Sequence, residues 1–453
     1  MPILFLGFVF LTGGGSRSDL TSLPLLRGGA ILFAFGAMLQ MDRSDWRRIR
    51  VPLLLLIAMT LWMIVQLIPL PPALWQSLPG RETIVAVDRL LGQPDLWRPI
   101  SLTPSQSFDS LLAMTVPFGA LLIFSRGDVE GNTRILFAIL CIGCGSALMG
   151  FMQMLSGPSS GAYLYRITNS NEMVGLFANR NHNAMLLASA VMISAMLLRD
   201  EFMRRKRRDV VSVCLGLIGL GVAVVTILVG SRAGLVAVAI AFAVGYVMVT
   251  SAWRSRGLPG ERKVQGRRAM VFPRWVVHAP VALIALLLAA AFWASDRSTG
   301  LTRIMAPDVA ADMRFQAWPI VRSMVETFWA FGSGFGSFPD VYEMFEPDRL
   351  LQPSYFNHAH NDWAEILITG GIPAVVILLA TIVWIARAAL RGGLSSLLKG
   401  YRGDTRLSAL VILLLLAMGS LVDYPLRVPS IQVLAILMVI LLCCPSSAST
   451  RRD

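Results

Sequence analysis

Apolar residues recur along the chain in runs of about 17 to 22 residues, the length that a helix needs to cross roughly 30 Å of hydrocarbon. The runs predict eleven membrane-spanning helices, near residues 25–41, 51–70, 109–124, 135–155, 183–198, 210–229, 233–251, 276–294, 366–386, 407–422 and 430–444. A shorter apolar run, residues 2–12, ends in Gly13-Gly14-Gly15. It is either a truncated first helix or a signal-like start, and we favour a twelfth helix because no small-residue cleavage site follows.

Composition supports the same class. Hydrophobic residues make up 55% of the 453 residues and charged residues only 15%, which is too apolar for a soluble globular chain. We therefore expect an all-α polytopic membrane protein whose single transmembrane domain covers residues 1–453.

Basic residues orient this domain, because Lys and Arg accumulate in cytoplasmic loops. With both termini inside, the cytoplasmic segments carry most of the 40 Lys and Arg residues and every lysine; these segments are 42–50, 125–134, 199–209, 252–275, 387–406 and the C-terminal tail. The net charge of +13 is then explained by topology and by contact with anionic lipid. It requires no nucleic-acid partner.

Two outer segments interrupt the membrane helices, at about 71–108 and 295–365. Both are expected to form short amphipathic helices on the membrane surface, with Trp75 and Trp97 at the level of the headgroups. The second segment is the large periplasmic loop of this topology.

The five cysteines all fall inside predicted spans, so they indicate neither a disulfide framework nor a metal site. Cys141 and Cys144 have the spacing of a redox motif, but they lie in an apolar helix. We interpret them as packing residues.

Polar residues gather at the outer ends of several predicted helices. The clusters are Asn179-Arg180-Asn181-His182-Asn183, Ser231-Arg232, Arg314, His358 with His360, Asn361 and Asp362, and Asp423 with Arg427. Helices that are distant in sequence can bring such clusters to one cavity, and polar groups at this depth usually mark a substrate path.

The pair His358 and His360 stands directly before a long apolar run. Asp362 and Glu365 fit a capping box that starts a helix just after His360. The positive end of that helix favours a neutral imidazole, which can accept a proton, and also favours a nearby phosphate. The alternative is a histidine that only hydrogen-bonds at a helix end, and a metal site lacks a strong third ligand.

Arg232 and Arg314 are candidate anion ligands. Arg232 lies between two closely spaced spans, where its side chain either reaches the interface or meets an anion. Arg314 shares a helix face with Trp318, and two arginines can hold a diphosphate. The glycines of residues 332–336 resemble a nucleotide-binding loop only superficially, and we interpret them as a flexible outer turn. The sequence contains neither GxxxxGK[ST] nor Asp-x-Asp, so nucleotide-driven transport and metal-assisted nucleotide-sugar chemistry are unsupported.

Taken in order, these motifs resemble the O-antigen ligase and Wzy-type polymerase family of bacterial membrane glycosyltransferases. The resemblance covers residues 175–373 through GLFANRNHNA, GSRAG, RFQAW, GSGFGSF and HAHNDWAEILITGGIP. The most specific part is His360-Asn361 followed by Gly371. RPISLTP at 98–104 and SLVDYPLRVPS at 420–430 are similar to the exopolysaccharide branch of the family, although Gly419 stands where that branch often has a histidine.

The resemblance implies about twelve helices in a GT-C-like fold that acts at the periplasmic face of the bacterial inner membrane. The donor would be an undecaprenyl-diphosphate-linked oligosaccharide, and no metal or other cofactor would be needed. The essential base would fall on His360, and the residues that bind the diphosphate on Arg232 and Arg314. Further substrate contacts are expected from His358, Asn361, Asp362, Asn179, Arg180, His182 and Arg427.

Three reactions remain open. Polymerisation of repeat units is favoured by the exopolysaccharide-like flanking segments, and a chain-length regulator is then a possible partner. Ligation of a finished glycan to lipid A-core is the alternative within the family. A flippase or transporter of polyprenol-linked glycans is the alternative from another class, but it predicts charged residues in both halves of the membrane.

Overall fold

The computed structural model describes residues 1–127, 129–157, 161–203, 209–255, 282, 309–351, 356–391 and 400–443. Apart from one isolated antiparallel bridge between Leu70 and Arg98, these residues form helices, turns and irregular segments. The chain divides into two compact units. Unit 1 comprises Met1–Asp128, Val309–Gly392 and Leu416–Asp453, and unit 2 comprises Val129–Asp308 and Gly393–Leu415.

Seven helices of the described residues are long and apolar enough to cross a membrane. They are Arg43–Val65, Pro104–Phe124, Asn132–Ser156, Arg180–Met203, Asp209–Leu228, Arg232–Trp253 and Asp362–Leu390. Four shorter apolar helices are Pro2–Thr12, Leu23–Met38, Thr405–Gly419 and Pro429–Cys443. Each of the eleven overlaps a predicted apolar run, so the prediction of a helical polytopic membrane protein is confirmed. The predicted span at 276–294 falls, except for one residue, outside the described part of the chain, and the total of about twelve stays a prediction.

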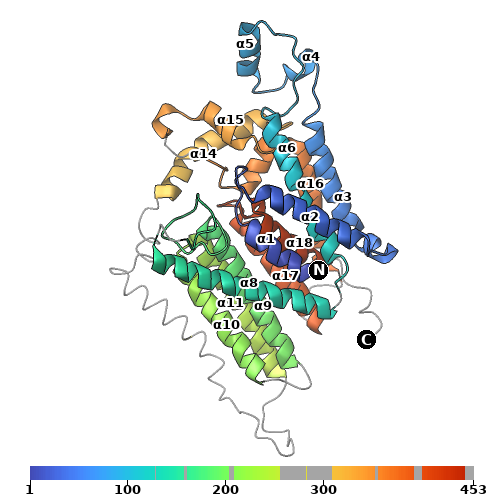
Figure 1. The fold of residues 1–453 in the computed structure, drawn as a ribbon, viewed down its shortest axis with the longest axis vertical. Coiled ribbons are helices and arrows are strands. Elements are labelled where there is room, and N and C mark those ends of the chain that lie inside the picture. Colours follow the sequence, from blue (N-terminus) through green and yellow to red (C-terminus); the bar gives the residue numbers. More distant parts are fainter. Residues whose placement is uncertain are drawn as a thin grey trace, which may run out of the picture. The chain divides into compact units, whose positions relative to one another are not determined.

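Unit 2 contains a helical bundle centred on α9. The bundle consists of α8 (Val129–Ser156), α9 (Arg180–Met203), α10 (Asp209–Leu228) and α11 (Arg232–Ser255), which lie side by side in Figure 1. Residues on all faces of α9 are buried, as expected for a central helix. Glycines allow close approach: a Cβ atom at Gly245 would lie 2.6 Å from the Cβ of Ala195.

Unit 1 contains the remaining helices whose bounds fall within it. They are α1 (Pro2–Thr12), α2 (Leu23–Met38), α3 (Arg43–Val65), α4 (Pro72–Trp75), α5 (Glu82–Leu90), α6 (Pro104–Ala113), α7 (Thr115–Phe124), α14 (Val309–Phe328), α15 (Phe338–Phe345), η2 (Asp348–Leu350), α16 (Asp362–Leu390), η4 (Pro425–Arg427) and α18 (Pro429–Cys443). Helix α17 has the bounds Gly400–Gly419. Within unit 1, α16 contacts α3, α14 and α18.

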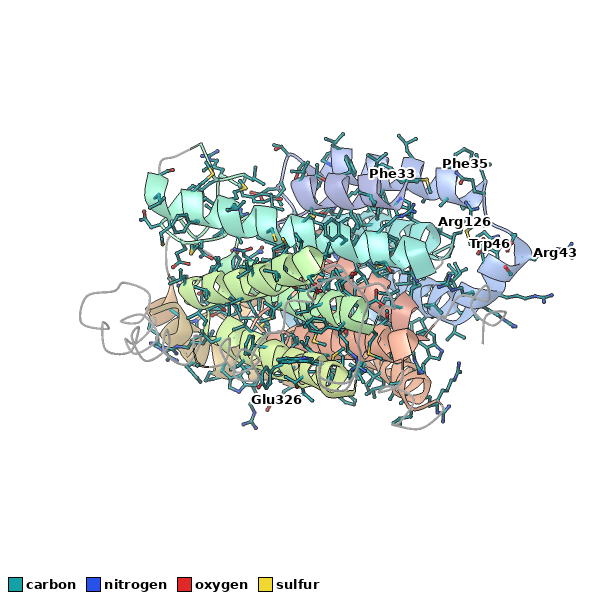
Figure 2. The ribbon with its side chains drawn as sticks, turned by 90° about the horizontal axis from the view of Figure 1, so that it is seen from below. Phe33, Phe35, Arg43, Trp46, Arg126 and Glu326 are labelled. Carbon is teal, nitrogen blue, oxygen red and sulfur yellow. The ribbon has the colours of Figure 1, made fainter. Side chains whose placement is uncertain are left out.

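Two predicted cytoplasmic segments meet at one end of unit 1. Asp42 caps α3 by accepting hydrogen bonds from the backbone N–H groups of Ser44 and Asp45. Arg126, which follows α7, lies near this first turn in Figure 2 and pairs with Asp45 at 3.6 Å. This pair agrees with a topology in which segments 42–50 and 125–134 lie on the same side of the membrane.

The segment of residues 71–108 makes contacts within itself, and Trp75 takes part in them. Trp75 is buried, its Nε1 donates to the carbonyl of Leu96 at 2.8 Å, and the guanidinium of Arg98 lies 5.9 Å from its ring centroid. Trp75 therefore packs inside the segment, where its indole N–H finds its partner, and its predicted place at headgroup level stays a prediction. Trp97 is 63% exposed, so its prediction stands untested.

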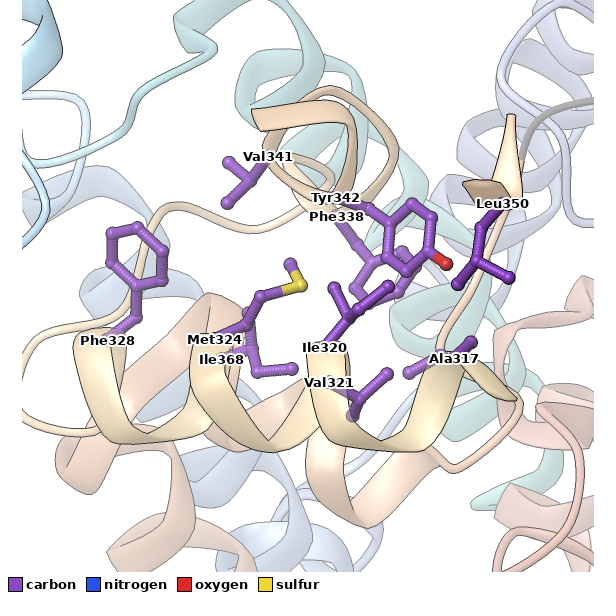
Figure 3. Close-up of a cluster of buried hydrophobic side chains, with 11 residues drawn as sticks. Ala317, Ile320, Val321, Met324, Phe328, Phe338, Val341, Tyr342, Leu350 and Ile368 are labelled. Carbon is purple, nitrogen blue, oxygen red and sulfur yellow. The ribbon is translucent and has the colours of Figure 1, made fainter. Parts of the chain in front are cut away.

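A hydrophobic cluster joins the large outer loop to α16. Residues of α14 spaced three or four apart, namely Ala317, Val321, Met324 and Phe328, form one cluster with Tyr342 of α15 and Ile368 of α16 (Figure 3). The opposite face of α14 is exposed, so α14 is an amphipathic helix, as predicted. Packing of this face fixes α14 and α15 beside the N-terminal part of α16.

Helix α16 is discontinuous at Gly371, which has φ +63° and ψ −167°. This conformation is open essentially only to glycine. The N–H of Ile372 turns away from Ile368 and donates to the carbonyl of Trp329 at 2.8 Å. Pro373 has no N–H, so the carbonyl of Thr369 also loses its partner within the helix.

Other parts of unit 1 replace the lost hydrogen bonds. The carbonyl of Ile368 accepts from Ser333 N–H at 2.9 Å, and that of Thr369 accepts from Gly334 N–H at 3.0 Å and from Gln66 Nε2 at 2.9 Å. The carbonyl of Gly370 accepts from Trp62 Nε1 at 2.7 Å. All these backbone groups are thereby satisfied, as a break inside a membrane helix requires.

The glycine turn at residues 332–336 is part of this arrangement. Gly332, Gly334 and Gly336 have φ values of +78°, +105° and +84°. Ser333 and Ser337 are fully buried, and a Cβ atom at Gly332 would lie 2.3 Å from the carbonyl oxygen of Thr369. The turn is confirmed, but its interpretation as a flexible outer element is wrong, because its backbone packs against the break in α16.

The substitution Gly371→Ala should destabilise the protein. Its Cβ atom would lie 2.6 Å from the nitrogen of Gly332, and the strained backbone alone costs about 1–3 kcal/mol. Thermal unfolding of the purified protein should show a lower midpoint. Gly28→Ala is the matched control, because a Cβ atom there meets nothing within 4 Å. Equal midpoints for the two variants would contradict this account of the break.

Candidate functional site

The predicted histidine pair lies in the turn that leads into α16. The helix starts at Asp362, directly after His360 and Asn361, as predicted. The cap is different from the prediction: the side chain of Asn361 accepts a hydrogen bond from Ala364 N–H at 3.0 Å. The capping box of Asp362 and Glu365 is therefore wrong, because both carboxylates are engaged elsewhere in the site.

His360 is bound to a buried carboxylate. Its Nδ1 lies 3.1 Å from Oδ1 of Asp423, whose side chain is only 3% exposed. Asp423 Oδ1 also accepts a hydrogen bond from Tyr424 N–H at 3.0 Å. The sequence predicted only the helix N-terminus as an electrostatic neighbour of this ring. The carboxylate opposes that effect, because it stabilises a protonated imidazole.

His358 is bound to a second buried carboxylate. Its Nδ1 lies 3.0 Å from Oε1 of Glu365, and the backbone N–H of Ala359 donates to Oε2 at 2.9 Å. The Glu365 side chain is 1% exposed. Both oxygens of Glu365 therefore hold the turn that precedes His360.

Arg427 joins the last outer segment to the start of α16. Its Nε lies 3.2 Å from Asp362 Oδ1 and its Nη1 lies 3.2 Å from Glu365 Oε1. Asp362 also accepts from the hydroxyl of Ser420 at 2.9 Å. Arg427 and Asp362, which were predicted to bind substrate, are thus brought together as an ion pair.

Aromatic rings pack around the two histidines. The ring of Tyr424 lies 4.4 Å from His358 and 4.9 Å from His360, measured between centroids. Phe356 meets His360 edge to face at 5.7 Å and stacks on Tyr342 of α15 at 5.1 Å. Burial, followed by the nearby Glu346, raises the pKa of Tyr342 to about 12, so its phenol is neutral. This column connects the hydrophobic cluster of Figure 3 to the turn.

Three residues of this site were absent from the predicted site. Glu365 was interpreted as a capping residue, Asp423 only as part of an outer polar cluster, and Tyr424 was not considered. An available signal was that acidic residues beside apolar runs need partners. The sequence alone does not show which histidine each acid meets.

The predicted residues of unit 2 form a separate group. Arg180 pairs with Glu172 at 2.8 Å, and the side chain of Asn179 accepts from Asn181 N–H at 2.9 Å at the start of α9. His182 is buried, with its ring 6.4 Å from that of Phe177. These contacts hold the loop before α9, and the predicted binding roles of these residues stay predictions.

The two arginines predicted to hold a diphosphate lie in different units, Arg232 in unit 2 and Arg314 in unit 1. Arg232 is the first residue of α11 in unit 2 and is exposed, while the hydroxyl of Ser231 accepts from Gly234 N–H at 3.0 Å and caps the helix. Arg314 lies in α14, but its side chain is outside the described residues. A shared diphosphate site for Arg232, Arg314 and His360 therefore stays a prediction.

The arrangement around His360 is suited to proton transfer. When Nδ1–H donates to Asp423, the other ring nitrogen, Nε2, is the basic one, and the carboxylate stabilises the charge that develops as Nε2 accepts a proton. Within the described ranges, no group of three or more His, Cys, Asp or Glu residues is positioned to hold a metal ion.

Comparison with known proteins supports the family resemblance. Residues 217–379 match the family model described as O-Antigen ligase. The match supports the resemblance of this part of the chain to the O-antigen ligase family. It includes Arg232, Arg314 and His360 and ends before Asp423. A search of curated proteins found no match to the chain.

Replacing Arg427 by methionine should destabilise unit 1, because Asp362 and Glu365 would lose their cation inside the protein. We expect a loss of about 3 kcal/mol, the lower end of the range for a broken buried pair, since the Arg427 side chain is 21% exposed. Unfolding of the purified variant in detergent measures this loss.

Arg322→Met is the control for this measurement. Its pair with Glu326 is 74% and 61% exposed, and such pairs contribute about 0–1 kcal/mol. Equal stability of the Arg427 and Arg322 variants would show that the Arg427 ion pairs do not hold the last outer segment.

Proposed function

We propose that the protein is a membrane glycosyltransferase of the O-antigen ligase and polymerase family. It transfers a glycan from undecaprenyl diphosphate to a sugar hydroxyl at the periplasmic face of the bacterial inner membrane. The observation that carries the proposal is the pair of His360 and Asp423, with Nδ1 and Oδ1 3.1 Å apart at the outer end of α16. The family match over residues 217–379 supports the reaction class.

In the proposed reaction, His360 acts as the general base. Its Nε2 takes the proton of the acceptor hydroxyl while the hydroxyl oxygen attacks the anomeric carbon of the donor. The bond between that carbon and the diphosphate oxygen breaks, and the diphosphate leaves with the bonding electrons. Attack opposite to the leaving group inverts the anomeric centre. Asp423 stabilises the imidazolium that forms.

Arg232 and Arg314 are proposed to stabilise the departing diphosphate. Guanidinium groups match phosphate oxygens with two parallel hydrogen bonds, and electrostatic stabilisation of developing charge is usually a large part of catalysis. The support is the sequence motifs that carry both arginines. No metal or other cofactor is assigned to the reaction.

Repeat-unit polymerisation is the reaction that we favour, because segments 98–104 and 420–430 are similar to the exopolysaccharide branch. The specific support is that Asp423 and Tyr424 of the second segment contact the histidines, and that Arg427 pairs with Asp362 and Glu365 at the start of α16. Ligation to lipid A-core is the second candidate, favoured by the description of the matching family model.

Purified protein with a synthetic lipid-diphosphate oligosaccharide tests the proposal. Products that grow by whole repeat units support polymerisation, and transfer only to added lipid A-core supports ligation. Absence of any new glycosidic bond under conditions that keep the protein folded would contradict the proposal and favour a transporter.

The variant His360→Ala should lose transfer by about 10² to 10⁴-fold, the contribution of a general base. Because it also leaves the buried Asp423 without its imidazole partner, folding of the variant is measured beside its rate. His358→Ala should lose less, since its ring contacts Glu365 and not Asp423. Rates in the same assay, with thermal unfolding as the control for folding, measure the difference. A near-normal rate for His360→Ala together with a lost rate for His358→Ala would show that His358, and not His360, is the general base.

A further inference from the structure

The backbone of His360 is held in an unusual conformation. Its φ is +48°, and among the described non-glycine residues only Asn171 also has a positive φ. Such conformations are costly for residues with a Cβ atom and persist only where the surroundings enforce them. The surroundings of His360 therefore contain the groups that impose this turn.

On the C-terminal side, the turn is held by Asn361. Its side chain caps α16 through Ala364 N–H and donates from Nδ2 to the carbonyl of Leu421 at 3.1 Å. On the N-terminal side, it is held by Glu365, because the N–H of Ala359 donates to Oε2 of this carboxylate. The turn between these two anchors contains the base.

Glu365 gathers three donors although it lies within α16. Besides Ala359 N–H, it meets His358 Nδ1 at 3.0 Å and Arg427 Nη1 at 3.2 Å. Within the described part of the chain, Nε2 of His358 is buried without a hydrogen-bond partner, and the described polar contact of the ring is the one between Nδ1 and Glu365. His358 therefore links the segment before His360 to the carboxylate of Glu365.

We propose that Glu365 is a positioning residue for His360: by holding Ala359 N–H, His358 and Arg427, it fixes the left-handed turn that directs the His360 ring onto Asp423. The inference rests on the proposed function for its catalytic meaning. Glu365 contacts Ala359 N–H, His358 and Arg427, so it acts on His360 through the backbone of the turn. Asp423 contacts the ring itself.

Loss of this anchor should let His360 return to a common negative φ and move its ring away from Asp423. A protonated imidazole is stabilised by a neighbouring carboxylate. Without that neighbour, the ring should titrate at a lower pH. Among the described residues, the charged and titratable groups in contact with the turn or with its anchors are Asp423, Tyr424, Glu365, Asp362, Arg427 and His358.

Glu365→Gln is the first variant. A carboxylate offers acceptors on both sides, whereas an amide replaces one acceptor by a donor that opposes Ala359 N–H, His358 or Arg427. Glu365→Asp is the second variant, because it keeps the buried charge beside Arg427 but shortens the side chain by one methylene. If the Glu365→Gln variant does not fold, the Glu365→Asp variant still tests the proposal.

The measurement is a histidine NMR titration of the full chain in lipid nanodiscs. The chain has only four histidines, and the His360 signal is identified by its loss in His360→Gln. Asp423→Asn defines the shift that follows from loss of the carboxylate. We expect both Glu365 variants to move the His360 midpoint to lower pH by at least half of that shift.

Glu326→Gln is the matched control, because this exposed carboxylate (labelled in Figure 2) pairs only on the surface of α14 with Arg322. It should leave the His360 midpoint unchanged. An unchanged midpoint in folded Glu365 variants, while Asp423→Asn shifts it, would overturn the inference.

Transfer kinetics provide the second readout. A positioning role predicts that the Glu365 variants lose at least tenfold in kcat, while KM for the donor is retained. The loss should not exceed the whole contribution of a general base, about 10² to 10⁴-fold. Equal loss of stability and activity with an unmoved pH profile would indicate a structural role only. The NMR titration does not require turnover, so failure of the proposed function is distinguishable from failure of this inference.

Discussion

The structure of unit 1 depends on replacing the backbone hydrogen bonds that α16 loses at Gly371. An unsatisfied carbonyl or N–H at this depth is costly, because lipid offers no partner. The glycine turn at 332–336 and the side chains of Trp62 and Gln66 supply the partners. This requirement ties α3 and the large outer loop to the outer half of α16. The histidine turn stands at the end of that half-helix, so its position follows from the same hydrogen bonds.

Buried charges then determine the geometry of the turn. Glu365 and Asp423 are both nearly inaccessible, and a buried carboxylate needs donors to remain charged. Glu365 obtains them from Ala359, His358 and Arg427, and Asp423 from His360 and the backbone of Tyr424. The donors come from the turn and from the segment before α18. Each acid thus holds one histidine, which explains why two histidines one residue apart have different neighbours and why we assign them different roles.

Sequence reasoning predicted the helices well, because long apolar runs report directly on burial in lipid. It also predicted the helix start after His360. It did not predict that the glycine turn is packed. The positive φ values of the turn allow its backbone to contact Thr369, which is distant in sequence. The burial of Trp75 was missed for a similar reason: its indole partner, the Leu96 carbonyl, belongs to a fold inside the outer segment. The partners of His358 and His360 depend on how the segment around Asp423 approaches α16, which local patterns do not encode.

A double-mutant cycle on transfer tests the central claim most directly, namely that Asp423 acts through His360. The rates of His360→Ala, Asp423→Asn and the double variant are compared with the wild-type rate in one assay. If Asp423 acts through the imidazole, its replacement slows the wild-type protein but does not slow His360→Ala further. If the two losses multiply in the double variant, Asp423 contributes independently of His360, and the pair is not the catalytic unit.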